Sequence, residues 1–356
     1  MYRSFAVKNF RCFRNLALAD LERVNLIAGK NNVGKTALLE ALFIHCGAWN
    51  PELALQINAF RGIEAIKVEF GRWAETPWDT LFKDFDVSQS VQLEGDDDLT
   101  GRRTLSLKLV RDPSELAKLR ISVLTTNGSA LGSSEAAQVL ELEYYQEKHG
   151  GKYYMIFDAK GFRLEPVPPP PPFPAFFQGA RMRLPAKEEA KLFGDLENRG
   201  EQEVVLKVLQ LVEPRLKRIF VRFIGEPMLY GEVGLRRSLP LRLMGDGMSR
   251  LFNLVLHISN APGGVVLVDE IENGLHYTVL PKVWQAIAET ARHFGTQVFA
   301  TTHSLECIAA AHEAFSQVGV YDFRLHRLDR VGDDIRVVNY DQETLTAALE
   351  TGLEIR

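Results

Sequence analysis

The pattern of hydrophobic and polar positions changes along this chain. Short, mainly apolar runs that predict strands occur at residues 23–28, Val265–Val268 and 297–300, and Val265–Val268 is continuously apolar, as in a strand that is covered on both faces. Between the first and second runs, much of residues 64–164 alternates apolar and polar side chains with a period of two, as antiparallel strands do. The strands expected there include residues 64–70 and 119–124. Leucine and alanine recur at helical spacing over Lys35–Cys46. The pattern predicts an α/β protein whose mostly parallel sheet is interrupted by an antiparallel insertion.

A glycine-rich stretch, GKNNVGKT, joins the first apolar run to this helix and fits the phosphate-binding pattern G-x-x-x-x-G-K-[ST]. Its glycines let main-chain N–H groups approach a polyphosphate. Lys35 can then reach the β- and γ-phosphates, and the Thr36 hydroxyl can bind Mg²⁺. We therefore expect a nucleoside triphosphate with Mg²⁺, and ATP more than GTP because no N-K-x-D motif is present. The predicted binding residues of this loop are Gly29, Lys30, Asn31, Asn32, Val33, Gly34, Lys35 and Thr36.

The other two apolar runs each end in polar residues. Asp269 and Glu270 follow Val265–Val268, at the sheet edge where parallel α/β sheets bind their ligands. One carboxylate there can hold Mg²⁺, and its neighbour can orient or deprotonate an attacking water. His303 follows the third run at the same edge, where its position suits a donor to the γ-phosphate.

A second glycine-rich element, Gly245-Asp246-Gly247, lies between a strand expected at residues 239–244 and a helix with apolar periodicity. Such a helix N-terminus can bind an anion. The first loop already holds the phosphates of its own chain. We therefore expect the second loop to meet the nucleotide of another subunit.

Composition narrows the class of protein. A hydrophobic content of 46% over 356 residues supplies a real core, and a formal net charge of −4 argues against a generally basic nucleic-acid-binding surface, but not against a local one. Cys12, Cys46 and Cys307 lack zinc-site spacing and fit reduced thiols. No signal peptide and no run of 18 apolar residues is present, so we expect a cytoplasmic protein without a membrane partner.

Four segments are expected. Residues 1–60 hold the first part of the nucleotide-binding core, 61–165 an antiparallel β lobe, 166–175 a proline-rich connector, and 176–356 a helical lobe and the rest of the core. Within the β lobe, the acidic run at residues 96–98 has no spaced partners and is interpreted as a solvated turn.

This order of parts resembles the ABC-type ATPases, and more narrowly the SMC, RecF and OLD branch, which typically starts with the N-F-R-x-F found here at residues 9–13. The resemblance implies a catalytic set of Lys35, Glu270 and His303, in which Glu270 activates water and His303 senses the γ-phosphate. It implies that Thr36 and Asp269 support the metal, and that Arg11 lies near the nucleotide. Gln178 is the candidate for the glutamine with which this family probes its metal.

Several features depart from the family pattern. Gly245 stands where the usual second loop has serine, so backbone N–H groups would replace a hydroxyl contact, and His276 stands where transport-type members carry aspartate. Residues 185–212 are too short for an SMC coiled coil. Only 53 residues follow His303, which leaves no room for the TOPRIM nuclease domain of OLD proteins. We therefore expect an ATPase that is not itself a nuclease.

The resemblance implies that two chains close head to tail over two ATP molecules, as a homodimer or a higher even-numbered oligomer. Two purposes stay open. The protein is either a nucleotide-dependent regulator or scaffold for a separate effector, a nuclease in phage defence being one candidate, or a RecF/SMC-like ATP-dependent clamp on DNA in repair or maintenance.

Overall fold

The computed structural model describes most of the chain. The strands expected at residues 64–70 and 119–124, and the segment boundary after residue 60, lie outside the described residues. The described residues are 1–59, 76–112, 115–116, 138–147, 149–158, 161–180, 182–317 and 319–356.

Six strands form the central sheet, in the order β16-β15-β3-β14-β13-β9. Every neighbouring pair is parallel except β15 and β16. The α/β fold with a mostly parallel sheet is therefore confirmed. The strands are β3 (Val24–Gly29), β9 (Ala175–Gln178), β13 (Val265–Val268), β14 (Gln297–Thr301), β15 (Phe323–Val331) and β16 (Asp334–Tyr340).

Seven further strands form an antiparallel sheet in the order β2-β1-β4-β5-β6-β7-β8. The N-terminal hairpin belongs to this sheet, because β1 pairs with β4 as well as with β2. Strands from the first sequence segment and from the insertion thus share one layer. They are β1 (Tyr2–Phe10), β2 (Phe13–Leu18), β4 (Val91–Asp97), β5 (Gly101–Val110), β6 (Gln138–Gln146), β7 (His149–Asp158) and β8 (Gly161–Glu165).

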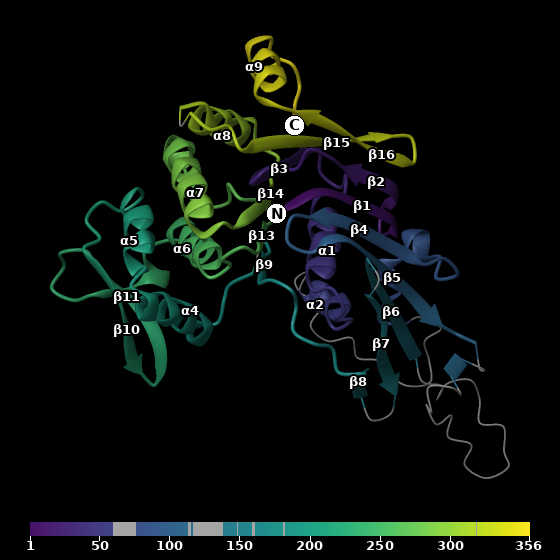
Figure 1. Cartoon of the computed structure of the whole chain (residues 1–356). Coiled ribbons are helices and arrows are strands. Elements are labelled where there is room, and N and C mark those ends of the chain that lie inside the picture. Colours follow the sequence, from purple (N-terminus) through teal and green to yellow (C-terminus); the bar gives the residue numbers. More distant parts are fainter. Residues whose placement is uncertain are drawn as a thin grey trace.

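Helix α1 (Lys35–Cys46) lies between the two sheets (Figure 1). Every residue from Ala37 to Cys46 is buried, and the same hydrophobic cluster contains side chains of both sheets. A helix without a polar face belongs in an interior, and the two polar side chains in this buried stretch are paired, Glu40 with Arg11 and His45 with Tyr2. The N-terminus of α1 is therefore held rigidly at the edge of the central sheet.

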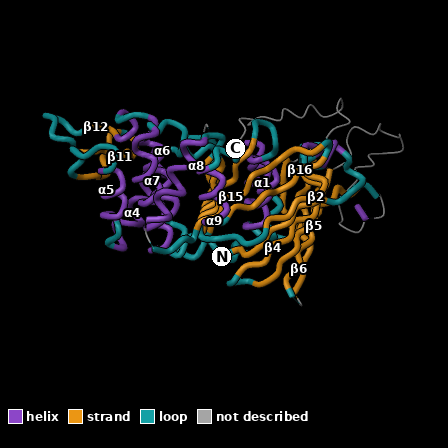
Figure 2. The backbone as a smooth tube through the Cα atoms, turned by 90° about the horizontal axis from the view of Figure 1, so that it is seen from above, coloured by secondary structure: helices purple, strands orange, loops and turns teal. Residues whose placement is uncertain are grey.

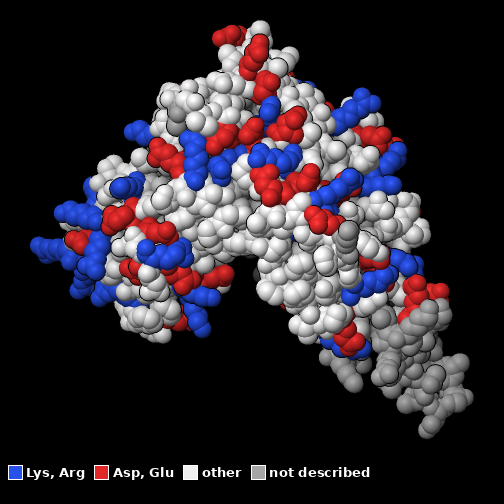
Figure 3. Space-filling view, in the orientation of Figure 1, with Lys and Arg blue, Asp and Glu red and all other residues white. Residues whose placement is uncertain are grey.

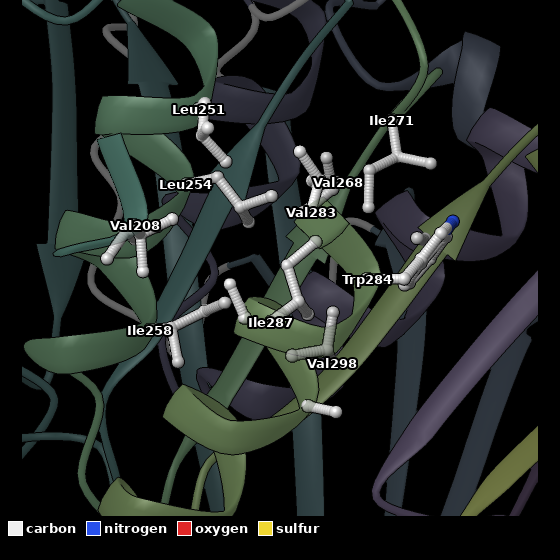
Figure 4. Close-up of a cluster of buried hydrophobic side chains, with 14 of the residues drawn as sticks. Val208, Leu251, Leu254, Ile258, Val268, Ile271, Val283, Trp284, Ile287 and Val298 are labelled. Atoms are coloured by element: carbon white, nitrogen blue, oxygen red, sulfur yellow. The ribbon is translucent and has the colours of Figure 1, made fainter. Parts of the chain in front are cut away.

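Helices cover the other face of the central sheet, so strands and helices separate into two halves when the molecule is seen from above (Figure 2). Side chains of α5, α6 and α7 pack there against Val268 and Val298 (Figure 4). The helices are α2 (Leu53–Ala59), α4 (Ala186–Arg199), α5 (Gln202–Gln210), α6 (Asp246–Ser259), α7 (Leu280–Phe294), α8 (Leu305–Gln317) and α9 (Gln342–Glu350). A small sheet of β10 (Arg218–Ile224), β11 (Glu226–Glu232) and β12 (Leu239–Pro240) completes the helical lobe.

Two local expectations were wrong. The acidic run is not a solvated turn throughout, because Asp97 is buried and pairs at 3.1 Å with Arg103, which is itself fully buried. The neighbouring strand supplies this partner, which sequence spacing did not reveal. The strand expected at residues 239–244 ends at Pro240, which has no N–H to extend the ladder, and a 3-10 turn follows at Leu241–Leu243.

The proline-rich segment runs from β8 to β9 beside the end of α1. Trp49 donates its indole N–H to the carbonyl oxygen of Pro169 at 2.6 Å, which ties the segment to the first part of the chain. In the part of the chain that the structure describes, no helix is long and apolar enough to cross a membrane.

Candidate active site

A cavity of 970 Å³ opens where β3, β13 and β14 end and α1 begins. It gathers the phosphate-binding loop, the acidic pair, His303 and Arg11 into one space. Its lining residues are Arg11, Cys12, Asn31, Asn32, Gly34, Lys35, Thr36, Ala37, Thr80, Phe82, Lys83, Asp84, Phe85, Asp269, Glu270, His303 and Arg330.

The phosphate-binding loop needs its two glycines. Gly29 has φ +142°, and a Cβ there would lie 2.7 Å from the carbonyl oxygen of Leu328. Gly34 has φ +104°, and its Cβ would lie 2.6 Å from Sγ of Cys12. Asn32 also has a positive φ, while the Val33 side chain is buried and anchors the loop. The two glycines therefore let the loop bring its backbone close to a ligand at the N-terminus of α1.

Lys35 lies across this loop. Its ammonium donates to the carbonyl oxygens of Gly29 at 2.6 Å and Lys30 at 3.1 Å. Burial lowers the pKa of Lys35, and the carboxylates of Asp269, Glu270 and Glu272 oppose that shift. A cation held in a partly desolvated site attracts phosphate more strongly than one in water.

Hard oxygen atoms converge beside the lysine. The Thr36 hydroxyl lies 3.1 and 3.0 Å from the two carboxylate oxygens of Asp269, which is 7% exposed. The Thr301 hydroxyl donates to the same carboxylate at 2.6 Å. No group of three His, Cys, Asp or Glu side chains suited to a metal occurs among the described residues. A hydroxyl and one carboxylate nevertheless fit Mg²⁺, which usually keeps several waters and binds substrate phosphates in NTPase sites.

Glu270 is held in an unusual backbone conformation. Its φ is +51°, which is uncommon outside glycine, and its N–H donates to the Thr301 hydroxyl at 2.8 Å. The Asn273 amide donates to its carboxylate at 2.6 Å. Backbone strain of this kind persists only where surrounding contacts enforce it, and it concentrates at functional sites. The contacts therefore aim one carboxylate oxygen of Glu270 in a defined direction.

His303 is half-exposed at the cavity and is oriented by Glu272, a residue that sequence reasoning missed. One Glu272 oxygen lies 3.2 Å from Nδ1 of His303 and accepts its backbone N–H at 3.1 Å. The same oxygen accepts the Thr302 hydroxyl at 2.8 Å. A third acidic residue two positions after Glu270 was the available signal. With Nδ1 engaged, Nε2 is left to face the cavity or the solvent.

Arg250 was also missed, because it lies in α6, away from any recognised motif. Its guanidinium donates to the carbonyl oxygens of Asp269 at 3.0 Å and Glu270 at 3.1 Å, and also to that of Ala180. Burial lowers the pKa of Arg250. The helix that follows the second glycine loop is thus connected directly to the backbone of the acidic pair.

Gln178 ends β9, next to the acidic strand, and its carbonyl oxygen accepts the Asp269 N–H at 2.9 Å. Its side chain is buried and donates to the carbonyl oxygen of Arg250 at 3.2 Å. It does not line the cavity. The structure therefore places this candidate metal probe beside the site, in contact with Arg250.

Arg11 lines the cavity in a left-handed backbone conformation, with φ +49°. Its guanidinium pairs with the buried Glu40 carboxylate at 2.8 Å and donates to Asn58 at 3.3 Å. Arg330 was not singled out by its sequence. It donates to the carbonyl oxygen of Asn32 at 3.2 Å and supplies a second arginine to the lining.

The second glycine loop does not line this cavity. Gly245 has φ +111° and an open surrounding, and the neighbouring Asp246 is exposed and pairs with Arg183. A Cβ on Gly247 would lie 2.0 Å from the carbonyl oxygen of Gly274, so the lack of a side chain there serves packing within the chain. The loop is thus separate from the phosphate-binding loop of its own chain.

The fold and the geometry of this cavity define a P-loop ATPase. A family model described as "AAA domain, putative AbiEii toxin, Type IV TA system" matches residues 109–309, and one described as "AAA ATPase domain" matches residues 1–86. The first match covers more than half of the chain. The protein therefore belongs to this family of AAA-domain ATPases.

Individual relatives agree with this class. The chain is 24% identical over 332 residues to an "ATP/GTP phosphatase" of Helicobacter pylori, covering 86% of each chain. It is 30% identical over 114 residues to an uncharacterised protein of Methanocaldococcus jannaschii, which covers 32% of this chain and 99% of that protein. Among solved structures, an SMC head bound to the C-terminal winged-helix domain of ScpA is similar in fold, with a TM-score of 0.53, 11% identity, and coverage of 97% and 99%.

Proposed function

We propose that this protein is an ATP-driven switch in which two chains close head to tail over two ATP molecules and reopen after hydrolysis. The observation that carries the proposal is that the two glycine-rich loops, each of which can bind an anion, lie at separate places on one chain. The phosphate-binding loop, Thr36, Asp269 and Glu270 meet at one cavity, whereas Gly245–Gly247 lies apart from it in the same chain. A second helix N-terminus that cannot serve its own chain's phosphates is available to those of a partner.

In this mechanism the chain's own residues have separate roles. The loop N–H groups and Lys35 bind the β- and γ-phosphates, and Thr36 and Asp269 would hold Mg²⁺, which supplies charge neutralisation on the phosphates when bound. Glu270 accepts a proton from the attacking water, and its contacts with Thr301 and Asn273 keep it in position. His303, oriented by Glu272, donates to the γ-phosphate.

Arg250, which accepts a hydrogen bond from Gln178 at its carbonyl oxygen, connects closure of the two chains to ATP hydrolysis. Arg250 joins α6, whose N-terminus is the second glycine loop, to the carbonyl oxygens of Asp269 and Glu270. When a partner's nucleotide binds at Gly245, any shift of α6 therefore moves Arg250 and, through it, the backbone of Asp269 and Glu270. Hydrolysis removes the γ-phosphate that joins the two chains, and the pair opens.

The open and closed states would present different surfaces to a separate effector protein, with a nuclease of a phage-defence system as one candidate. The description of the matching family, which names a putative AbiEii toxin and a type IV TA system, supports a role as a regulator in such a system. A DNA clamp of the RecF/SMC type is the second candidate. The SMC-head-like fold favours it.

The proposal is tested by measuring the molar mass of the protein in solution with and without ATP. Glu270→Gln should bind ATP without hydrolysing it and form a dimer in ATP and Mg²⁺ that is absent or weaker without nucleotide. Lys35→Ala, which loses the cradle, should not respond to ATP. Light scattering that gives one mass for Glu270→Gln with and without ATP, and crosslinks that do not change, would overturn ATP-driven closure.

A further inference from the structure

The small sheet of the helical lobe carries a concentration of positive charge. Residues 215–237 contain six Lys or Arg and two Glu, a net charge of +4 in a chain whose formal net charge is −4. In Figure 3, Lys and Arg side chains gather at the left edge, over the region where Figure 1 shows β10 and β11. This edge lies on the opposite side of the molecule from the antiparallel sheet. The charge is therefore local, as the overall composition permits.

The sheet has one covered face and one open face. Ile219 and Leu229 are buried in the core of the helical lobe, and α4 packs against β11. Successive side chains of a strand point to opposite faces, so Arg218, Phe220 and Arg222 lie on the other side of β10. Tyr230 joins them, because it is the register partner of Phe220.

Rings and guanidinium groups alternate across this open face. The Arg218 guanidinium lies 5.2 Å from the Phe220 ring centre, and the Arg222 guanidinium lies 5.2 Å from the Tyr230 ring centre. The two rings are stacked with an interplanar angle of 23° and centres 6.3 Å apart. These contacts hold the long arginine side chains against a flat aromatic surface, which reduces the entropy lost when they bind a ligand.

Most of the basic side chains on this surface form no ion pair with the residues that the structure describes. Arg215 pairs with Glu213 at 2.8 Å, and this contact lowers the pKa of Glu213 to about 2. Arg215 is therefore not counted among the basic residues available to a ligand. Five other exposed basic residues have no ion pair within the described chain. They are Lys217, Arg218, Arg222, Arg236 and Arg237.

The tip of the hairpin adds exposed apolar groups. Phe223 is 78% exposed and Ile224 is 67% exposed at the end of β10. Because side chains alternate along the strand, Ile224 continues the open face, whereas Phe223 projects on the side of Ile219. Unpaired charge alone fits any polyanion. Charge combined with accessible rings fits a polyanion that carries flat apolar groups of its own.

We propose that the open face and tip of β10 and β11 bind single-stranded nucleic acid, with the basic side chains on phosphates, Phe220 and Tyr230 against unpaired bases on the open face, and Phe223 against a base that passes around the tip. A duplex offers phosphates but keeps its bases stacked inside, so it cannot use the rings. An acidic protein segment offers charge but lacks regularly repeated flat groups. This ligand surface is distinct from the ATP site and involves none of its residues.

The experiment uses the full chain and fluorescence anisotropy. The probe is a labelled oligothymidine of about 20 nucleotides, longer than the ~4–16 nucleotides that a small binding module covers. Competitors are an unlabelled duplex of the same length and polyglutamate. The double variant Arg218→Ala with Arg222→Ala removes two cations, and Phe223→Ala removes one exposed ring. Arg336→Ala is the matched control, because Arg336 is also an exposed strand arginine without an ion pair among the described residues.

The double arginine variant is expected to bind about tenfold more weakly, with the slope of log affinity against log salt reduced by about 1.4, or ~0.7 per lost phosphate contact. Phe223→Ala is expected to bind about fivefold more weakly with the slope unchanged, since stacking carries no charge. The oligonucleotide affinity of Arg336→Ala is expected to match that of wild type. The ATP turnover of every variant in this experiment is also expected to match that of wild type.

Absence of oligothymidine binding, or equal losses in the double variant and in Arg336→Ala, would overturn the proposal. Duplex competition as strong as that of the single strand would refute the role of the rings, and equal competition by polyglutamate would assign the surface to an acidic protein. Lys35→Ala should keep the oligonucleotide affinity, so a failure of ATP-driven closure is distinguishable from a failure here.

Discussion

Replacement of Arg250 by methionine tests whether α6 positions the catalytic backbone. The methionine keeps an apolar stem of similar length but removes the donors to the carbonyl oxygens of Ala180, Asp269 and Glu270. Hydrogen bonds from a charged donor contribute ~1.5–3 kcal/mol each. Removal of the guanidinium also relieves its own desolvation, which lowers the Arg250 pKa, so the net loss of stability should be smaller, about 1–3 kcal/mol.

The effect on catalysis should be larger than the effect on folding. A shift of about 1 Å in a reacting group can lower a rate ~100-fold, so we expect kcat to fall by about 10- to 100-fold. The KM for ATP should stay near the wild-type value, because Lys35 and the phosphate-binding loop make no contact with Arg250 in the hydrogen bonds described. Arg250→Lys should recover part of the rate, since an ammonium can reach one carbonyl but not all three.

Steady-state ATP turnover and thermal unfolding are measured on the same samples. Arg23→Met is the matched control. Arg23 also donates to backbone carbonyls, those of Ala291 and Thr296, but at the opposite edge of the central sheet. It should lose stability with kcat unchanged. If Arg250→Met is destabilised as expected while turnover per folded molecule stays within about twofold of wild type, Arg250 is structural only and its positioning role is refuted.

Three further outcomes are expected. Lys35→Ala should lose ATP binding in a filter or calorimetric assay, while Glu270→Gln should bind ATP and hydrolyse it very slowly; wild-type turnover in Glu270→Gln would remove that carboxylate from the mechanism. The free energy of unfolding should fall as pH drops from 6.5 to 4, because burial lowers the pKa of His257 to about 4 and the unfolded chain therefore binds more protons. His257→Phe should remove up to ~3 kcal/mol of that loss at pH 4, which denaturant titrations at pH 7 and pH 4 would detect. The purified protein should not cut linear, supercoiled or single-stranded DNA with Mg²⁺ or Mn²⁺; nicking that disappears in the exposed variant Asp333→Ala but persists in Lys35→Ala would reveal a nuclease site.

Much of the fold followed from local pattern. Buried apolar runs predicted β3, β13 and β14, and helical spacing predicted α1 with the bounds Lys35–Cys46. The edge rule for parallel sheets predicted that Asp269 would lie at the ligand-binding edge, and this inference needs only strand direction and sequence order. The family resemblance implied that Asp269 and Thr36 support one metal, and their oxygens lie 3.0 Å apart although 233 positions separate the two residues.

Other features depend on contacts that no local pattern encodes. Arg250, Glu272 and Arg330 act on the site through hydrogen bonds whose partners are fixed only after the sheets and helices pack. Asp97 appeared to be a solvated residue until the fold placed the buried Arg103 beside it. The close contact of Gly247 with Gly274 of its own chain was likewise not encoded in the local sequence. A bulky residue at position 247 would therefore disturb the fold, and it could not be used to test contact with a second chain.

The central claim, that the active site is completed by a second chain, is tested most directly by complementation. Lys35→Ala lacks a working cradle but keeps its second glycine loop, whereas Asp246→Trp keeps the cradle and obstructs the loop at an exposed position. The Asp246 pair with Arg183 is exposed and contributes little to stability. Each variant alone should hydrolyse ATP very slowly. If two chains share each site, mixing them in equal amounts should restore about a quarter of wild-type turnover, because half of the dimers then contain one intact composite site. Turnover of the mixture no higher than the average of the two separate variants would contradict the head-to-tail arrangement.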